Sequence, residues 1–165
     1  CLLLFILVIL TIQVLKKGVF FMIEQDTIRL LRECDAGVKM GVSSINDVIQ
    51  YADSDELTHL LEKCRAEHNK LDDEIQMHLK RFDDDGKEPN PMAKSMSWMK
   101  TNMKLMMHES DETIADLMTD GCNMGVKSLN KYLNEYEAAD EYTKDIAKRL
   151  INLEAQLAVD MRGFL

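Results

Sequence analysis

One phrase is written twice in this chain. Residues 37–46 read GVKMGVSSIN and residues 121–130 read GCNMGVKSLN, so that Gly37 aligns with Gly121 and Gly41 with Gly125. Each copy is followed by an Ala-Asp pair and then by a further apolar pattern. Such a repeat predicts a duplicated helical hairpin with similar internal geometry in both halves of the chain.

Apolar residues recur at every third or fourth position in four long segments, as they do in amphipathic helices. The four stripes run through residues 28–49, 57–82, 114–133 and 146–161. The 165 residues include only two prolines and seven glycines, and helix-favouring residues outnumber strand-favouring ones. We therefore expect an all-α fold, an antiparallel four-helix bundle that forms one domain over residues 22–165.

Polar residues indicate where these helices begin and where the two hairpins separate. Asp53, with Glu56 three residues later, is expected to cap the second helix, and Ser110 is expected to cap the third, from Asp111 to about Tyr136. Between them, DDDGKEPNP at residues 83–91 has the composition of a loop. We therefore expect a long crossover with a short connecting helix between the two hairpins.

Residues 1–21, CLLLFILVILTIQVLKKGVFF, differ from the rest of the chain because they are almost entirely apolar. The run from Leu2 to Leu15 is shorter than the ~20 residues of a membrane-spanning helix, and a basic leader and cleavage site of a secretory signal are missing. We expect an untranslated leader before Met22, because KKGV can be encoded by a purine-rich ribosome-binding sequence. The alternative is a membrane anchor, in which Lys16 and Lys17 hold the domain on the cytoplasmic side.

The repeated phrase places two glycines four residues apart on each of two helices. A glycine inside a helix costs about 1 kcal/mol relative to alanine, so a compensating interaction is expected. Small residues at this spacing allow two helices to approach closely. We expect the first and third helices to pack against each other at Gly37, Gly41, Gly121 and Gly125. A ligand groove lined by these glycines is the alternative.

Polar side chains also fall on the core stripes. If the first hairpin turns near Ala52 and Asp53, then Asp35 lies level with His68, and the repeat carries that level to residues 154–156. One interpretation is a buried hydrogen bond between a carboxylate and the histidine. The other is a vestigial or unusual metal site formed by Asp35, His68 and Glu154, since imidazole and carboxylates suit iron, manganese or zinc. In a third, one or both side chains face solvent.

Five methionines at helical spacing follow the loop, namely Met92, Met96, Met99, Met103 and Met106. Methionine fills irregular gaps in a core, which is the simplest role for this stripe under a crossover. Two alternatives are a surface for a partner helix and a copper site, because thioethers bind Cu(I). The cysteines lack metal-binding spacing and are expected to be buried free thiols.

The duplicated hairpin, the long crossover and several local motifs resemble the bacterial ferritin-like four-helix-bundle proteins of unknown function. The relevant motifs are DSDEL at residues 53–57, Trp98 in the connecting helix and SDE at residues 110–112. The ferritin-like fold implies a di-iron site in which two helices each supply Glu and the other two each supply Glu-x-x-His. This chain departs from that pattern: its one Glu-x-x-His, Glu56 to His59, begins a helix, and no usual ligand set is complete.

The charge and the missing motifs restrict the function. The net charge is −9, which leaves no excess of basic residues for nucleic acid, and no catalytic triad, P-loop or dinucleotide motif occurs. We therefore expect a non-catalytic, cytoplasmic bundle without a cofactor, which acts through a protein partner or as a homodimer. A metal-binding or redox protein of the ferritin-like type is the alternative, and a membrane is a partner only if residues 1–21 form an anchor.

Overall fold

The computed structural model describes residues 2–91, 94, 100–103, 105 and 108–165, with side chains from residue 8 onward. The long helices are α1 (Leu2–Val48), α2 (Asp55–Leu79), α4 (Asp111–Glu135) and α5 (Glu141–Asp160). Short 3₁₀ turns follow three of them, at Ile49–Tyr51, Lys80–Phe82 and Met161–Gly163. No strand occurs in the described part of the chain, so the expected all-α class is confirmed there.

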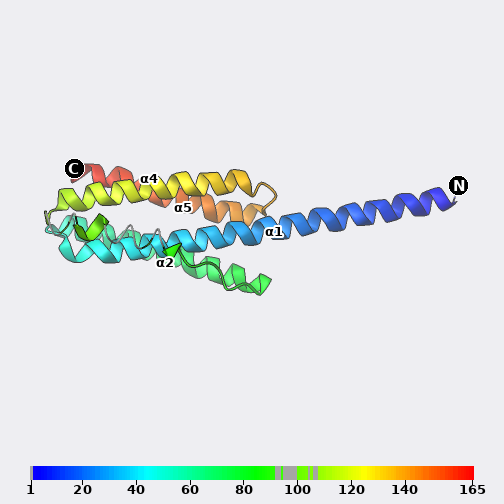
Figure 1. Cartoon of the computed structure of the whole chain (residues 1–165), viewed down its shortest axis with the longest axis horizontal. Coiled ribbons are helices and arrows are strands. Elements are labelled where there is room, and N and C mark those ends of the chain that lie inside the picture. Colours follow the sequence, from blue (N-terminus) through cyan, green and yellow to red (C-terminus); the bar gives the residue numbers. More distant parts are fainter. Residues whose placement is uncertain (1, 92–93, 95–99, 104, 106–107) are drawn as a thin grey trace.

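The helices lie side by side in pairs. α1 and α2 form one pair of opposite direction, and α4 and α5 form a second pair joined by the short turn at residues 136–140 (Figure 1). α1 also contacts α4 and α5, and α2 contacts α5, which closes the structure around a shared interior. α2 ends and α4 begins at opposite ends of this assembly (Figure 1).

The caps of the helices show one departure from the expected pattern. Ser54, not Asp53, caps α2, because its hydroxyl accepts a hydrogen bond from the Leu57 amide at 3.2 Å. The Asp53 amide instead donates to the carboxylate of Asp111 at 2.8 Å, which joins the first turn to the start of α4. Ser110 caps α4 as predicted, accepting from the Thr113 amide.

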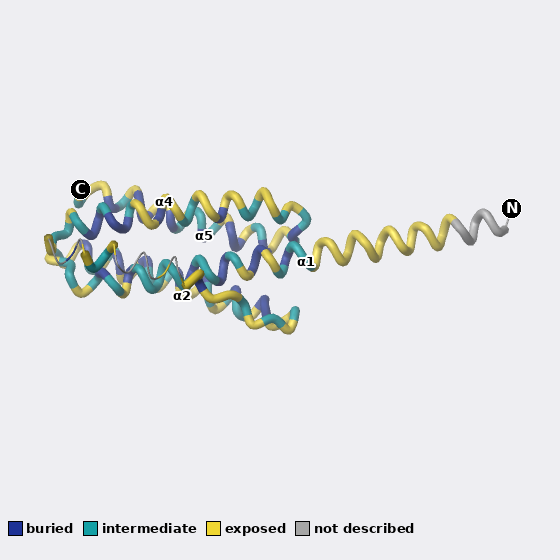
Figure 2. The backbone as a smooth tube through the Cα atoms, in the orientation of Figure 1, coloured by how far each residue is buried: buried dark blue, intermediate teal, exposed yellow. Residues whose placement is uncertain are grey.

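The apolar stripes predicted from the sequence supply the interior, which has two halves along the helix axes (Figure 2). The half near the first turn is built around Leu57, Leu61, Ile114 and Met161. The half near the turn between α4 and α5 is built around other fully buried side chains, Leu30, Leu31, Ile75, Ile146 and Leu150. Burial of each such side chain stabilises the fold by roughly 1.5–3 kcal/mol.

The first half of α1 extends beyond the other helices (Figures 1 and 2). Residues 8–24 are exposed, and Thr27 and Leu30 are the first residues of α1 that the neighbouring helices bury. We call residues 8–23 the α1 extension. Within the described residues, no helix combines the length and the apolar character that crossing a membrane requires.

Candidate functional site

The most deeply buried polar contact joins α2 to α5. His68 is fully buried, and its Nε2 lies 2.9 Å from Oε1 of Glu154. The other ring nitrogen, Nδ1, lies 2.9 Å from the Cys64 carbonyl oxygen, one helical turn earlier. With a proton on each nitrogen, the ring donates two hydrogen bonds and leaves neither nitrogen free.

Two glycines and two cysteines surround this pair. A Cβ at Gly41 on α1 would come within 2.6 Å of His68 Nε2, and a Cβ at Gly125 on α4 would lie 3.6 Å from the Glu154 carboxyl carbon. The Sγ of Cys64 lies 3.5 Å from His68 Nδ1, and the Cys122 thiol is close enough to the Glu154 carboxylate for its charge to raise the thiol pKa. All four long helices therefore contribute to one level of the interior.

The surroundings of His68 favour its charged form. Burial lowers the pKa of His68, but hydrogen bonds to Cys64 and Glu154 and the negative charge of Glu154 outweigh burial and raise it from 6.5 to about 10. The surroundings of the Cys122 thiol favour its neutral form. Burial, and then the Glu154 charge, raise the pKa of the Cys122 thiol well above its ordinary value. The site is thus an ion pair beside a protonated, weakly nucleophilic thiol.

The stability of the protein is expected to fall as pH rises through this histidine's titration. Because the folded-state pKa exceeds the ordinary value, the contribution is complete below pH 6.5 and is lost as pH approaches 10. Urea denaturation at a series of pH values in this window measures it. In the double variant His68→Leu/Glu154→Met, which lacks the ion pair, the remaining pH dependence of stability comes from the other ionisable groups. An identical pH dependence in both proteins would contradict the ion pair.

Asp35 does not lie level with His68, which corrects the sequence interpretation. Its carboxylate is fully buried and accepts hydrogen bonds from Gln76 Nε2 and from the Lys87 amide, each at 2.7 Å. Lys39 Nζ lies 3.2 Å away on the same helix. Gln76 is two helical turns beyond His68 on α2. Asp35 therefore fixes the start of the crossover against α1 instead of pairing with the histidine.

The structure consequently separates the three residues proposed as metal ligands. His68 and Glu154 meet, but Asp35 is at another level, and no group of three His, Cys, Asp or Glu side chains suited to a metal ion occurs among the described residues. Both nitrogens of His68 are already hydrogen-bonded. The residues present thus do not fit the di-iron centre that the ferritin-like resemblance implies.

The four repeated glycines have four different environments. Gly37 faces the side chains of Leu150 and Leu129 at ordinary contact distances, whereas Gly121 has nothing within 4 Å of its Cβ position. The expected packing role is therefore wrong for Gly121. At Gly41 and Gly125 the nearest atoms are those of His68 and Glu154, not the backbone of the facing helix. Gly41 therefore makes room for the ion pair, whereas a Cβ at Gly125 would make only ordinary contacts with Glu154.

Alanine substitutions at Gly41 and Gly121 are expected to have opposite effects. Gly41→Ala should lower the free energy of unfolding by about 1–2 kcal/mol, because the methyl group overlaps the His68 ring and the overlap exceeds the gain in helix propensity. Gly121→Ala, in open space on α4, should raise it by up to about 1 kcal/mol. Chemical denaturation measures both, and a stabilised Gly41→Ala protein would contradict the proposed close packing.

The methionine stripe lies mainly outside the described residues. The described residues do not include Met92, Met96, Met99 and Met106, so the expected partner surface formed by these methionines stays a prediction. Met103 is described, and its side chain is 62% exposed.

Sequence reasoning missed the partners of Asp35. Gly86 has φ of +82°, and a Cβ there would collide with Asp35 Oδ2. The composition of residues 83–91 predicts only a loop, and the glycine within it is the local signal for this close approach. Ion pairs between Arg32 and Asp84 and between Lys87 and Glu33 hold the same loop on α1.

Comparison of the chain with models of protein families, with curated proteins and with solved structures gave no match.

Proposed function

We propose that this chain is a non-catalytic, ferritin-like helical bundle that acts through protein association. Two pairs of antiparallel helices, with α2 and α4 running in the same direction, support an antiparallel four-helix bundle with one long crossover. The central level supports a structural role, because both nitrogens of His68 are hydrogen-bonded and the raised pKa of Cys122 keeps that thiol protonated.

The observation that carries the association proposal is the apolar surface of the α1 extension. Eleven large hydrophobic side chains between Val8 and Ile23 are between 37% and 68% exposed. Together they present on the order of 1,000 Å² of apolar surface, whereas a monomer rarely presents a patch of more than a few hundred Å². A surface of this extent is stabilised when another molecule covers it.

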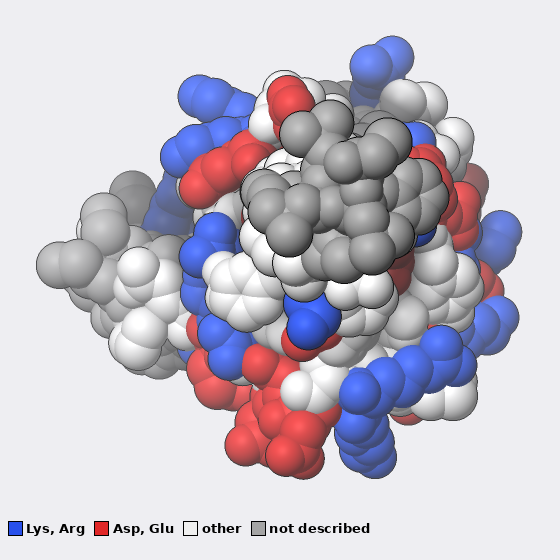
Figure 3. Space-filling model, turned by 90° about the vertical axis from the view of Figure 1, so that its right-hand side faces the viewer, with Lys and Arg blue, Asp and Glu red and all other residues white. Residues whose placement is uncertain are grey.

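The charges at this end of the molecule are of both signs. On the face of the molecule seen along the α1 extension, basic and acidic side chains both lie around the rim (Figure 3). No single sign of charge covers this face, so it does not present the continuous basic surface that phosphate backbones attract.

The full-length chain is expected to form a defined complex. Sedimentation velocity over a wide concentration range would detect self-association, and chemical crosslinking followed by affinity capture in lysate of the source cells would detect other proteins. The charge-reversal variant Lys63→Glu, at an exposed position near the start of α2 and so at the end of the helices away from the extension, is a control that should leave association unchanged. A monomer at every concentration, with no protein captured above the background of an unrelated bundle, would contradict the proposal.

A further inference from the structure

We infer that the α1 extension pairs with the same extension of a second copy of this chain in a parallel, two-stranded coiled coil. This inference rests on the proposed function of protein association and identifies the partner. Its seam consists of Val8, Ile12, Leu15, Val19 and Met22, which we call the extension seam.

The spacing of these residues is that of a coiled-coil seam. They follow one another by four, three, four and three positions, so they form one continuous apolar stripe that fits a heptad repeat. Gln13, Lys17 and Glu24 lie on the opposite side of the helix, together with the exposed Leu10, Val14 and Phe21. All five seam residues are between 46% and 67% exposed, and no other helix of the described chain covers them.

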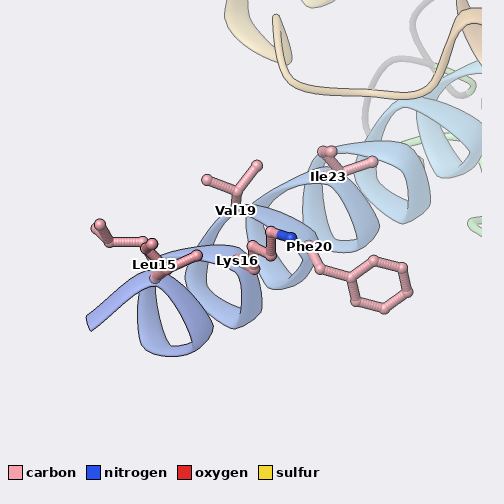
Figure 4. A pocket seen from close by; sticks show the side chains of 6 residues that line it. Leu15, Lys16, Val19, Phe20 and Ile23 are labelled. Atoms are coloured by element: carbon pink, nitrogen blue, oxygen red, sulfur yellow. The ribbon is translucent and has the colours of Figure 1, made fainter. Parts of the chain in front are cut away.

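The surface along the seam has the shape that receives a partner side chain. An apolar hollow is lined by Ile12, Leu15, Lys16, Val19, Phe20 and Ile23 (Figure 4). Ile12, Leu15, Lys16 and Val19 lie at positions i, i+3, i+4 and i+7, and four residues in this arrangement form the hole that holds one knob of a facing helix. The shallow hollow thus contains one hole of the seam, and Phe20 and Ile23 lie beside it.

The residue types select two parallel strands. Isoleucine and valine occupy the a positions at 12 and 19, and leucine and methionine occupy the d positions at 15 and 22. In parallel coiled coils, β-branched residues at a with leucine at d favour two strands over three or four. Lys16 then falls at an e position, whose neighbour in a parallel pair is a g position, here threonine or glycine. An antiparallel pairing would bring the two Lys16 side chains together.

A second helix fits this surface better than lipid. A bilayer would surround the helix and would have to accommodate Gln13, Lys16 and Lys17 within about one turn. A coiled-coil partner covers the seam and leaves Gln13 and Lys17 in water. The helix is also preorganised, because α1 continues without a break into the buried part of the structure at Thr27 and Leu30. Its free half projects beyond the other helices, so they do not block a partner (Figure 2).

Two matched variants of the full-length chain test the seam. The seam variant is Leu15→Gln/Val19→Gln, and the control variant Leu10→Gln/Val14→Gln removes similarly exposed side chains from other sides of the same helix. In sedimentation equilibrium the dissociation constant of the seam variant should rise by roughly a hundredfold or more, whereas the control should change by less than about threefold. Equal changes in the two variants would overturn the inference.

Vesicle binding distinguishes insertion of the α1 extension into lipid from its pairing with a second copy. The full chain and both variants are sedimented with vesicles of phosphatidylethanolamine and phosphatidylglycerol, and dimerisation without vesicles is expected to persist. A chain that is monomeric in buffer and binds vesicles equally well in both variants would overturn the inference. A chain that does not self-associate but captures another protein would contradict the pairing of two α1 extensions, while the proposed function of protein association would stand.

The parallel order has its own test. A cysteine at position 12 meets its counterpart in a parallel pair, so Ile12→Cys should give a disulfide-linked dimer under mild oxidation. In the antiparallel pair, position 12 faces a different layer. Failure of Ile12→Cys to crosslink, in a protein that still dimerises, would overturn the parallel arrangement.

Discussion

Replacing Glu154 with alanine is expected to lower the free energy of unfolding by about 3–5 kcal/mol. The change removes the carboxylate that accepts from His68 Nε2 and balances its charge. The buried ring must then either stay charged without a partner or lose its proton, and both alternatives destabilise the fold. Urea denaturation followed by circular dichroism near pH 7 measures the loss.

The control for this prediction removes both charges together. His68→Leu/Glu154→Met fills the same space with apolar groups and is expected to lie within about 2 kcal/mol of the unsubstituted protein. A double-mutant cycle with the two single variants then gives the coupling between the side chains. A loss below about 1 kcal/mol in Glu154→Ala, or a double variant less stable than both single variants, would contradict the buried ion pair.

Asp35→Ala is expected to lower the free energy of unfolding by about 2–4 kcal/mol. The substitution removes the acceptor of both the Gln76 side chain and the Lys87 amide, within a site that solvent does not reach. The loss should be accompanied by faster hydrogen exchange at the Lys87 amide, because the start of the crossover is released from α1. Denaturation and exchange monitored by mass spectrometry provide the two measurements.

A neighbouring carboxylate provides a matched control. Glu88 pairs with the same lysine, Lys39, at 2.6 Å, but its side chain is 78% exposed. Glu88→Ala is therefore expected to leave stability nearly unchanged, because water and salt screen exposed pairs. If Asp35→Ala and Glu88→Ala had equal effects, the proposed anchoring of the crossover by Asp35 would be wrong.

The helices could be predicted from the sequence because their signals are local. The third was expected from Asp111 to about Tyr136 and occupies Asp111–Glu135, since a serine cap and an apolar stripe both lie within the segment itself. The second helix was located correctly, but its cap was assigned one residue early. Asp53 and Ser54 are both good caps, and the contact of the Asp53 amide with Asp111 is not visible in the sequence.

Which residues of two paired helices face each other was harder to predict than the helices themselves, because it depends on where the turn between them lies. The expected turn at Ala52 and Asp53 placed Asp35 beside His68. The chain instead adds a 3₁₀ turn after α1 and begins α2 at Asp55. When the turn of a hairpin moves by one residue along the chain, a given residue on the first helix faces a residue two positions further along the second. Arg65 therefore bonds Asn46, and Gln76 bonds Asp35. The expected carboxylate–histidine contact exists, but Glu154 supplies the carboxylate.

The repeated phrase predicted the two helices but not the role of the glycines on them. Identical glycines on α1 and α4 have different neighbours, because α1 is surrounded by three other helices while α4 contacts mainly α1 and α5. Gly37 accordingly packs on leucines, and its counterpart Gly121 faces open space. Similar sequences fixed similar helices, and the different neighbours of each helix decided what the glycines do.

The bond between His68 and Glu154 joins residues 86 positions apart, which affects the order of assembly during synthesis. The first hairpin leaves the ribosome with His68 on its apolar face and no carboxylate to meet it until the last helix has been made. When α5 docks, a slip of one turn in either direction would place Leu150 or Ala158 against the ring. Only the native alignment neutralises the charge, so the pair rejects misaligned docking of the final helix.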